Sequence, residues 1–171
     1  MGPLTARIRP IDSPDDLTVE QRRAYDAVVA SRGRVIGPFT VLLHRPEIAS
    51  AAEALGGYLR YRAPLEDAVR EAVIVAVASL LECEFERSVH EPLARQAGVD
   101  VAAIAAGRPF AGDAGLAVEV ARSLVNEHRI PDELFARARD RWGDESLVDL
   151  VSLVGYYAFL AAVLNGFAVR P

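Results

Sequence analysis

The chain has 171 residues with a formal net charge of −5, and 51% of its residues are hydrophobic. These values predict one folded domain over residues 1–171 and exclude a disordered chain. All nineteen basic residues are arginines, but they form no basic run. Phosphate binding needs clustered positive charge, so nucleic acid is not the expected partner. The expected partner is a small molecule or another protein.

Cys83 is the only cysteine, which excludes a secreted scaffold held by disulfides within the chain. Residues 1–16 contain no apolar core of the length that a signal peptide requires, so we expect a cytoplasmic location.

The segment from Leu150 to Val169 carries no charge. Its length is enough to span a bilayer, but a helix that is apolar all round can equally be buried among other helices. No arginine cluster flanks the segment. We therefore predict a core or subunit-interface helix and no membrane partner.

The first half of the chain predicts four helices. Thr18 and Gln21 have capping-box spacing and Gly33 occupies a C-cap position, so the first helix spans 18–32. Residues 33–44 form an irregular or buried connector. Further helices are expected from Pro46 through the Gly56-Gly57 pair, from Pro64 through the apolar run 68–81, and over about 82–97.

The second half predicts four more helical segments. Asp100 is a candidate cap for a short helix over 101–107, and the remaining helices are expected over 112–129, 131–142 and 144–167. No segment shows the period-two alternation of a β-strand bounded by hairpin turns. The predicted fold class is all-α.

The stretch LECEFERSVH, residues 81–90, contains the most informative polar residues. On a helical wheel Cys83, Glu86 and His90 share an arc of about 60°. This arc lies between the apolar stripe and the charged face of the helix. We therefore predict that the three side chains form the wall of a cleft.

Each of these residues has a chemical role to offer. His90 suits proton transfer near neutral pH, and Glu86 can orient it or act as a carboxyl group with a raised pKa. The helix N-terminus can lower the thiol pKa of Cys83. Glu71 interrupts an apolar run, and a carboxylate in such surroundings needs a partner or a function.

Other interpretations of these residues stay open. A single histidine on a helix often lies at the surface or in a satisfied core position, and a single cysteine often packs as a small apolar residue. Glu86 and His90 are also spaced as metal ligands, but no second ligand pair is evident. We therefore predict no metal and no cofactor.

The spacing Glu71-x11-Cys83-x2-Glu86-x3-His90 resembles the carboxymuconolactone decarboxylase and AhpD-like alkylhydroperoxidase superfamily. The resemblance extends to residues 37–49, 55–65, 71–98 and 150–165. It implies one AhpD-like domain of about seven or eight helices, assembled as a trimer or hexamer, with an active-site cleft around these residues.

One position departs from the peroxidase branch of this superfamily. That branch has a Cys-x-x-Cys dithiol, and Glu86 stands here in place of the second cysteine. In the decarboxylase branch a glutamate precedes the family histidine by four residues, as Glu86 precedes His90. The resemblance thus favours acid–base chemistry by His90, oriented by Glu86 and Glu71, over dithiol redox chemistry. Cys83 is the fourth candidate catalytic residue.

The expected substrate is a small carboxylated or lactone-like molecule. Arginines pair well with carboxylates, so Arg60, Arg62 and Arg70 are candidate substrate-binding residues. His44 and Tyr157 are two further candidates. Two alternatives stay open: a peroxidase that uses Cys83 alone, and an oligomer that binds a small molecule without converting it.

Overall fold

The computed structural model describes residues 6–171, and these residues form helices and connecting segments without a β-strand. The predicted all-α class is confirmed. The eight helices are α1 (Val19–Arg32), α2 (Phe39–Leu42), α3 (Pro46–Tyr61), α4 (Asp67–Leu80), α5 (Glu84–Gln96), α6 (Val101–Ala105), α7 (Gly112–Glu127) and α8 (Asp132–Gly166).

The predicted caps of α1 are present. The Thr18 hydroxyl accepts the backbone N–H of Gln21, the Gln21 side chain accepts the backbone N–H of Thr18, and Gly33 ends the helix in the left-handed conformation. The predicted connector contains the short helix α2, whose four residues are all buried. These local signals place the end of α1, and therefore Arg32, next to the core.

Helix α3 begins at Pro46 as predicted and continues through Gly56 and Gly57. The expected start of the next helix at Pro64 is wrong, since α4 begins at Asp67. Leu65 is buried in the core and Glu66 has an extended ψ of 144°. The chain thus crosses from α3 to α4 in an extended segment because Leu65 must reach the core.

Helix α5 begins at Glu84, two residues later than expected, because Glu82 has a φ of +51° and Cys83 is the extended N-cap residue. The predicted Asp100 cap of α6 is present, with its carboxylate accepting the N–H of Ala103. Helix α7 matches the predicted segment within two residues.

Helix α8 is broken at Gly143, whose φ of 71° and ψ of 175° are not helical. This confirms the predicted separation of 131–142 from 144–167. The second part of α8 is long and apolar enough to cross a membrane by length and composition, and 56% of its most apolar window is buried within the fold. Most of its buried apolar side chains belong to the main core, and Ala161 and Leu164 belong to a second, small apolar cluster.

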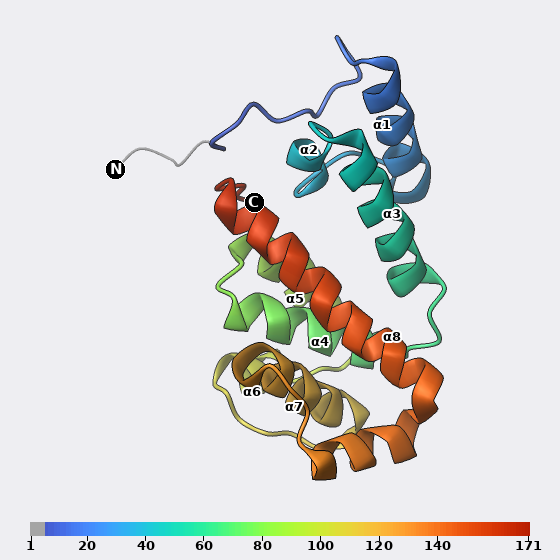
Figure 1. Cartoon of the computed structure of the whole chain (residues 1–171). Helices are drawn as coiled ribbons and strands as arrows, with labels where there is room; N and C mark the ends of the chain where they lie inside the picture. Colours follow the sequence, from blue (N-terminus) through green and yellow to red (C-terminus); the bar gives the residue numbers. More distant parts are fainter. Residues whose placement is uncertain (1–5) are drawn as a thin grey trace.

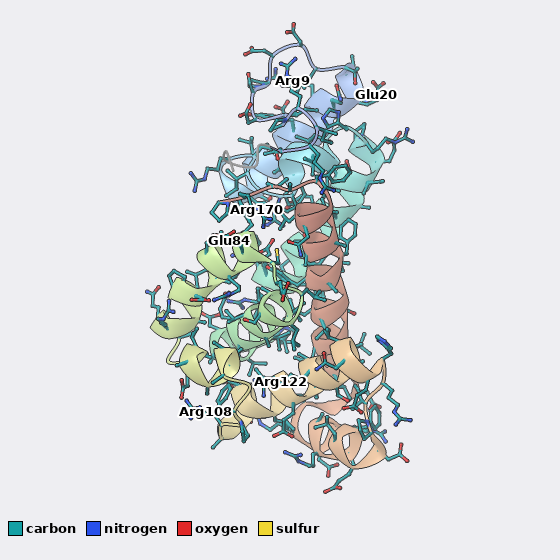
Figure 2. All side chains as sticks on the ribbon, turned by 90° about the vertical axis from the view of Figure 1, so that its left-hand side faces the viewer. Arg9, Glu20, Glu84, Arg108, Arg122 and Arg170 are labelled. Atoms are coloured by element: carbon teal, nitrogen blue, oxygen red, sulfur yellow. The ribbon has the colours of Figure 1, made fainter. Side chains whose placement is uncertain are left out.

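The long second part of α8 crosses the molecule diagonally, with α1–α3 on one side and α4–α7 on the other (Figure 1). Helix α4 lies at the centre, packed against α5, α7 and α8. Charged side chains such as Arg9, Glu20 and Arg108 project outward (Figure 2). Arg170 and Glu84 approach within 3.7 Å where the C-terminus meets the start of α5. Glu86 and His90 of α5 lie at the seam between these two groups of helices.

Candidate active site

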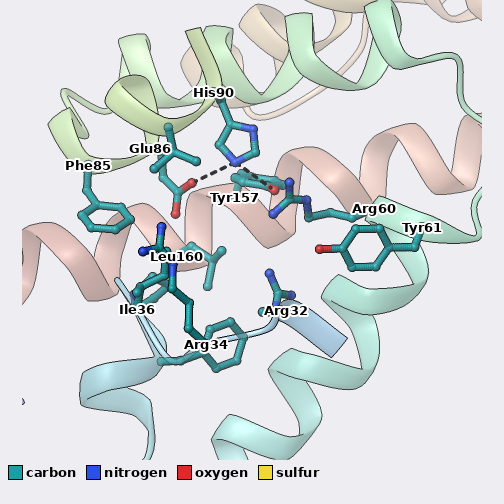
Figure 3. A pocket seen from close by; sticks show the side chains of 13 residues that line it. Arg32, Arg34, Ile36, Arg60, Tyr61, Phe85, Glu86, His90, Tyr157 and Leu160 are labelled. Carbon is teal, nitrogen blue, oxygen red and sulfur yellow. Dashed lines mark hydrogen bonds and ion pairs between the residues drawn. The ribbon is translucent and has the colours of Figure 1, made fainter. Parts of the chain in front are cut away.

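A cavity of about 260 Å³ lies at this seam. Its apolar walls come from the α1–α3 connector, α5 and α8: Ile36, Pro38, Phe39, Phe85, Val89 and Leu160. Its polar lining comes from α1, the connector, α3, α5 and α8: Arg32, Arg34, Arg60, Tyr61, Glu86, His90 and Tyr157. Figure 3 shows His90 and Glu86 on one side and the three arginines projecting toward the same space.

His90 is held from both sides of its ring. Its Nδ1–H donates to Oε2 of Glu71 on α4 at 2.6 Å, and its Nε2 lies 3.4 Å from Oε2 of Glu86, one turn earlier on α5. The side chains of His90, Glu71 and Glu86 are 2%, 5% and 6% exposed. We call these three residues the Glu–His–Glu cluster.

The charge of the cluster follows from its surroundings. Burial alone lowers the pKa of His90, but the hydrogen bonds and negative charges of Glu71 and Glu86 outweigh it, so the pKa is raised above its ordinary value. The protonated imidazolium is therefore favoured. With Nδ1 bound to Glu71, Nε2 is the nitrogen that faces the cavity.

Tyr157 on α8 completes this wall. Its hydroxyl lies 3.4 Å from Nε2 of His90, and the two rings meet edge to face with centroids 5.3 Å apart. Burial raises the pKa of Tyr157 well above its ordinary value, against the opposing positive charge of Arg60. Tyr157 thus remains a neutral hydroxyl beside the imidazolium.

Cys83 is not part of the cavity lining. Because it precedes the first turn of α5, the helical wheel that placed it beside Glu86 and His90 does not apply. Its side chain is fully buried in a small apolar cluster with Ala78, Ala161 and Leu164. Burial raises the pKa of the thiol, and the charge of Glu86 adds to this, which corrects the expectation of a lowered value.

Three of the expected substrate-binding residues lie outside the cavity. His44 is exposed and donates from Nε2 to the carbonyl of Arg9 at 2.8 Å, beside a different hollow. Arg62 is exposed, with its guanidinium 5.7 Å from the ring centroid of Tyr58. Spacing along α3 does not tell which arginine near its end faces inward.

Arg70 also points away from the cavity. Its Nη2 pairs with Asp67 at 2.6 Å and its Nε lies 3.5 Å from Oε1 of Glu71. It lines a separate open hollow together with Arg60 and Gln96. Arg70 therefore contacts the Glu–His–Glu cluster from behind, and Arg60 and Tyr157 are the expected binding residues that line the cavity.

Two lining arginines were missed from the sequence. Arg32 is the last residue of α1, where it pairs with the buried Glu53 of α3, and Arg34 follows in the connector. No local pattern predicts that this segment lies opposite α5. Within residues 6–171, Arg34 and Arg60 form no ion pair, and the buried Nη2 of Arg32 has no hydrogen-bond partner.

Gly56 explains how α8 approaches this region. A Cβ at Gly56 would lie 2.1 Å from the Tyr156 hydroxyl and 2.8 Å from Nη2 of Arg32. Only glycine leaves room for both groups at this position. The close contact brings α8, and with it Tyr157, against α3.

The fold and the site together define an all-helical protein with a buried Glu–His–Glu cluster at the edge of a polar cavity. The model of the carboxymuconolactone decarboxylase family matches residues 46–123, which include Arg60 and the whole cluster. This match supports the carboxymuconolactone decarboxylase and AhpD-like superfamily for residues 46–123, and the fold of the whole chain agrees with it.

Two solved structures share the fold. One, from Ralstonia eutropha JMP134, is described as an alkylhydroperoxidase AhpD core and an uncharacterized peroxidase-related protein. Its sequence is 19% identical to this chain, and the TM-score is 0.78. The superposition covers 97% of this chain and 92% of the Ralstonia chain. The other, an uncharacterized peroxidase-related protein from Silicibacter sp. TM1040, is 18% identical with a TM-score of 0.74, covering 100% of this chain and 93% of its own. No curated protein matches the chain in sequence.

Proposed function

We propose that this chain is an enzyme in which His90 acts as general acid–base on a small carboxylated molecule, by decarboxylation or by proton transfer of the kind that lactones undergo. The observation that carries the proposal is the Glu–His–Glu cluster, whose Nε2 faces a cavity also lined by arginines. A buried, hydrogen-bonded histidine with a perturbed pKa beside a cavity is a typical proton-transfer site.

The proposed chemistry assigns a role to each member of the cluster. Glu71 fixes the ring through Nδ1, so that Nε2 carries the transferable proton. In a decarboxylation, the C–C bond to the carboxylate breaks, carbon dioxide leaves, and the electron pair stays on carbon as an enolate. The imidazolium of His90 then donates its Nε2 proton to that carbon and takes a proton back from water. Glu86 stabilises the imidazolium between turnovers.

A peroxidase that uses Cys83 is the second candidate, because both structural neighbours are described as peroxidase-related. Its thiol is fully buried and its pKa is raised, both of which disfavour the reactive thiolate. The chain also has no second cysteine. These observations favour the acid–base proposal.

The test is proton exchange in heavy water. A panel of small carboxylic acids and carboxylated lactones is incubated with the protein, and deuterium incorporation and carbon dioxide release are followed by NMR. We expect one class of compound to react, with the reaction lost in His90→Gln and retained in His44→Gln, the control outside the cavity. A hydroperoxide-reducing activity that survives His90→Gln and is lost in Cys83→Ser would contradict the proposal, as would binding of the panel without any product.

The assembly is also a proposal. We propose a homo-oligomer, a trimer or hexamer, because three apolar side chains of α8, Val148, Val151 and Phe159, are between 36% and 65% exposed. Such exposed apolar residues on one long helix favour burial against another copy. A cytoplasmic location is a separate proposal. Light scattering on the purified chain would measure its mass, and a monomer at micromolar concentration would refute this assembly.

A further inference from the structure

The charged groups of the cavity do not balance. The cations that line it are Arg32, Arg34, Arg60 and the imidazolium of His90. The carboxylates that line it or pair with its lining residues are Glu53, Glu71 and Glu86. Four cations against three carboxylates leave one positive charge.

The arginines differ in how far they are already neutralised. Arg32 pairs with Glu53, and its guanidinium also lies 4.6 Å from the ring centroid of Phe39. Arg60 has no carboxylate partner within residues 6–171, and neither does Arg34. Arg60 and Arg34, which face the cavity from α3 and from the connector, therefore carry two positive charges without a partner (Figure 3). The Glu–His–Glu cluster carries one net negative charge, which leaves the single positive charge.

Arg60 is the guanidinium beside the reactive wall. Arg60 lies beside Tyr157 in the cavity lining (Figure 3), and the Tyr157 hydroxyl lies 3.4 Å from Nε2 of His90. A ligand group bound to Arg60 would thus place its neighbouring carbon near Nε2. The rest of the ligand would lie against the apolar walls formed by Ile36, Phe85 and Leu160.

We infer that the cavity selects a carboxylate with a single negative charge and an apolar body, anchored on Arg60 with the help of Arg34. A partly enclosed guanidinium without a partner gains a charge-assisted, bidentate contact from a carboxylate. One such anion balances the cavity, whereas a dianion would leave a negative charge in a partly apolar enclosure.

This inference rests on the proposed function and narrows it. A carboxylate held by guanidinium groups is stabilised as a carboxylate, so its loss as carbon dioxide is disfavoured. The anchored group then stays on the product, and the reaction is a proton transfer at a carbon next to it. Glu86, which lines the cavity beside His90, accepts the proton from that carbon, and the imidazolium of His90 donates its Nε2 proton to the same carbon. Glu86 then returns a proton to Nε2, so no oxidant or reductant is needed.

Binding of three matched probes tests the inference without any turnover. Phenylacetate is the monoanion, phenylacetamide its neutral analogue and phenylsuccinate the dianion, and each is titrated into the protein by calorimetry. We expect phenylacetate to bind at least about tenfold more tightly than the other two, since tenfold corresponds to the gain from one charged hydrogen bond. Equal binding of phenylacetamide, or tighter binding of phenylsuccinate, would overturn the inference.

Variants identify the anchor. Arg60→Gln should weaken phenylacetate binding by about tenfold to a hundredfold, and Arg34→Gln by less, because Arg34 is exposed. Arg62→Gln, an exposed neighbour outside the cavity, should bind like the wild type. Arg60→Lys keeps the charge and should recover part of the affinity, which separates loss of the anchor from loss of the fold. If Arg60→Gln and Arg62→Gln bind phenylacetate alike, Arg60 is not the anchor.

The outcome for the ligand is separate from that for catalysis. If phenylacetate binds through Arg60 but no compound exchanges a proton, the proposed function fails and the anion site stands. If proton exchange depends on His90 while a neutral analogue binds as well as phenylacetate, the function stands and the anion site fails.

Discussion

The hydrogen bond between Glu71 and His90 should stabilise the fold most strongly below neutral pH. Glu71→Gln removes the negative charge and keeps an oxygen that can accept the Nδ1–H of His90. The two side chains are 5% and 2% exposed and 2.6 Å apart, so solvent screens them little. A hydrogen bond to a charged group contributes about 1.5–3 kcal/mol and a neutral one about 0.5–1.5 kcal/mol, so we expect Glu71→Gln to lower the free energy of unfolding by about 1–2 kcal/mol at pH 6.

The sign of the pH dependence follows from the raised pKa of His90 in the folded state. The stabilisation is fully present below the ordinary histidine pKa of about 6.5 and is lost as the pH rises through the raised value. The difference in stability between the wild type and Glu71→Gln should therefore be largest near pH 6 and shrink as the pH approaches 9.

Urea unfolding at several pH values between 6 and 9 measures this difference. Glu91→Gln is the matched control, because Glu91 follows His90 on α5 and pairs with Arg87 and Arg95 at 2.9 and 2.8 Å near the surface. The pKa of Glu91 is lowered, chiefly by hydrogen bonds to the two arginines acting against burial, so its contribution is constant over this range. A loss in Glu71→Gln below about 0.5 kcal/mol at pH 6, or one equal at pH 6 and 9, would refute the reasoning.

Three further changes test the geometry of the fold. Native Cys83 should resist alkylation at pH 7 and react after denaturation, and rapid labelling of the folded protein would show that its thiol is not buried as described. Gly56→Ala should lower the free energy of unfolding in urea by about 1–3 kcal/mol, because the added Cβ meets the Tyr156 hydroxyl. Gly155→Ala is the control: its Cβ would have no atom within 4 Å, so it should be neutral or stabilise α8 by up to about 1 kcal/mol. Equal effects of the two substitutions would argue against the close packing at Gly56. Gly143→Ala should cost about 1–3 kcal/mol because its backbone conformation is accessible essentially only to glycine, and an unchanged melting temperature would mean that α8 is not broken there.

The local signals in the sequence determined most of the helices. Thr18, Gln21 and Gly33 bracket α1 because capping satisfies backbone groups within a few residues of the helix end. Asp100 marks a helix start for the same reason, whereas Pro46 marks one because it has no backbone N–H to leave unpaired in the first turn. The helix start predicted at Pro64 was wrong because Leu65 is buried in the core, and no short-range sequence pattern predicts that burial.

The Glu–His–Glu cluster was only partly visible in the sequence. Glu86 and His90 are one helical turn apart, so their common face follows from the helical period alone. Glu71 was suspected because it interrupts an apolar run, but its contact with Nδ1 of His90 depends on the packing of α4 against α5. Cys83 was misplaced because the start of α5 is set by the positive φ of Glu82.

The cationic side of the cavity was decided by the tertiary structure. Arg32, Arg34 and Arg60 come from the end of α1, the connector and the end of α3, and they meet His90 only because α8 and α5 close the cavity from the other side. Because all nineteen basic residues are arginines, the sequence gives no reason to choose these three among them. By itself the sequence determined most of the helices and the common face of Glu86 and His90, because short-range backbone and side-chain geometry fixes both. The contact of Glu71 with His90, and the choice of arginines that face them, depended on packing between segments distant in the chain.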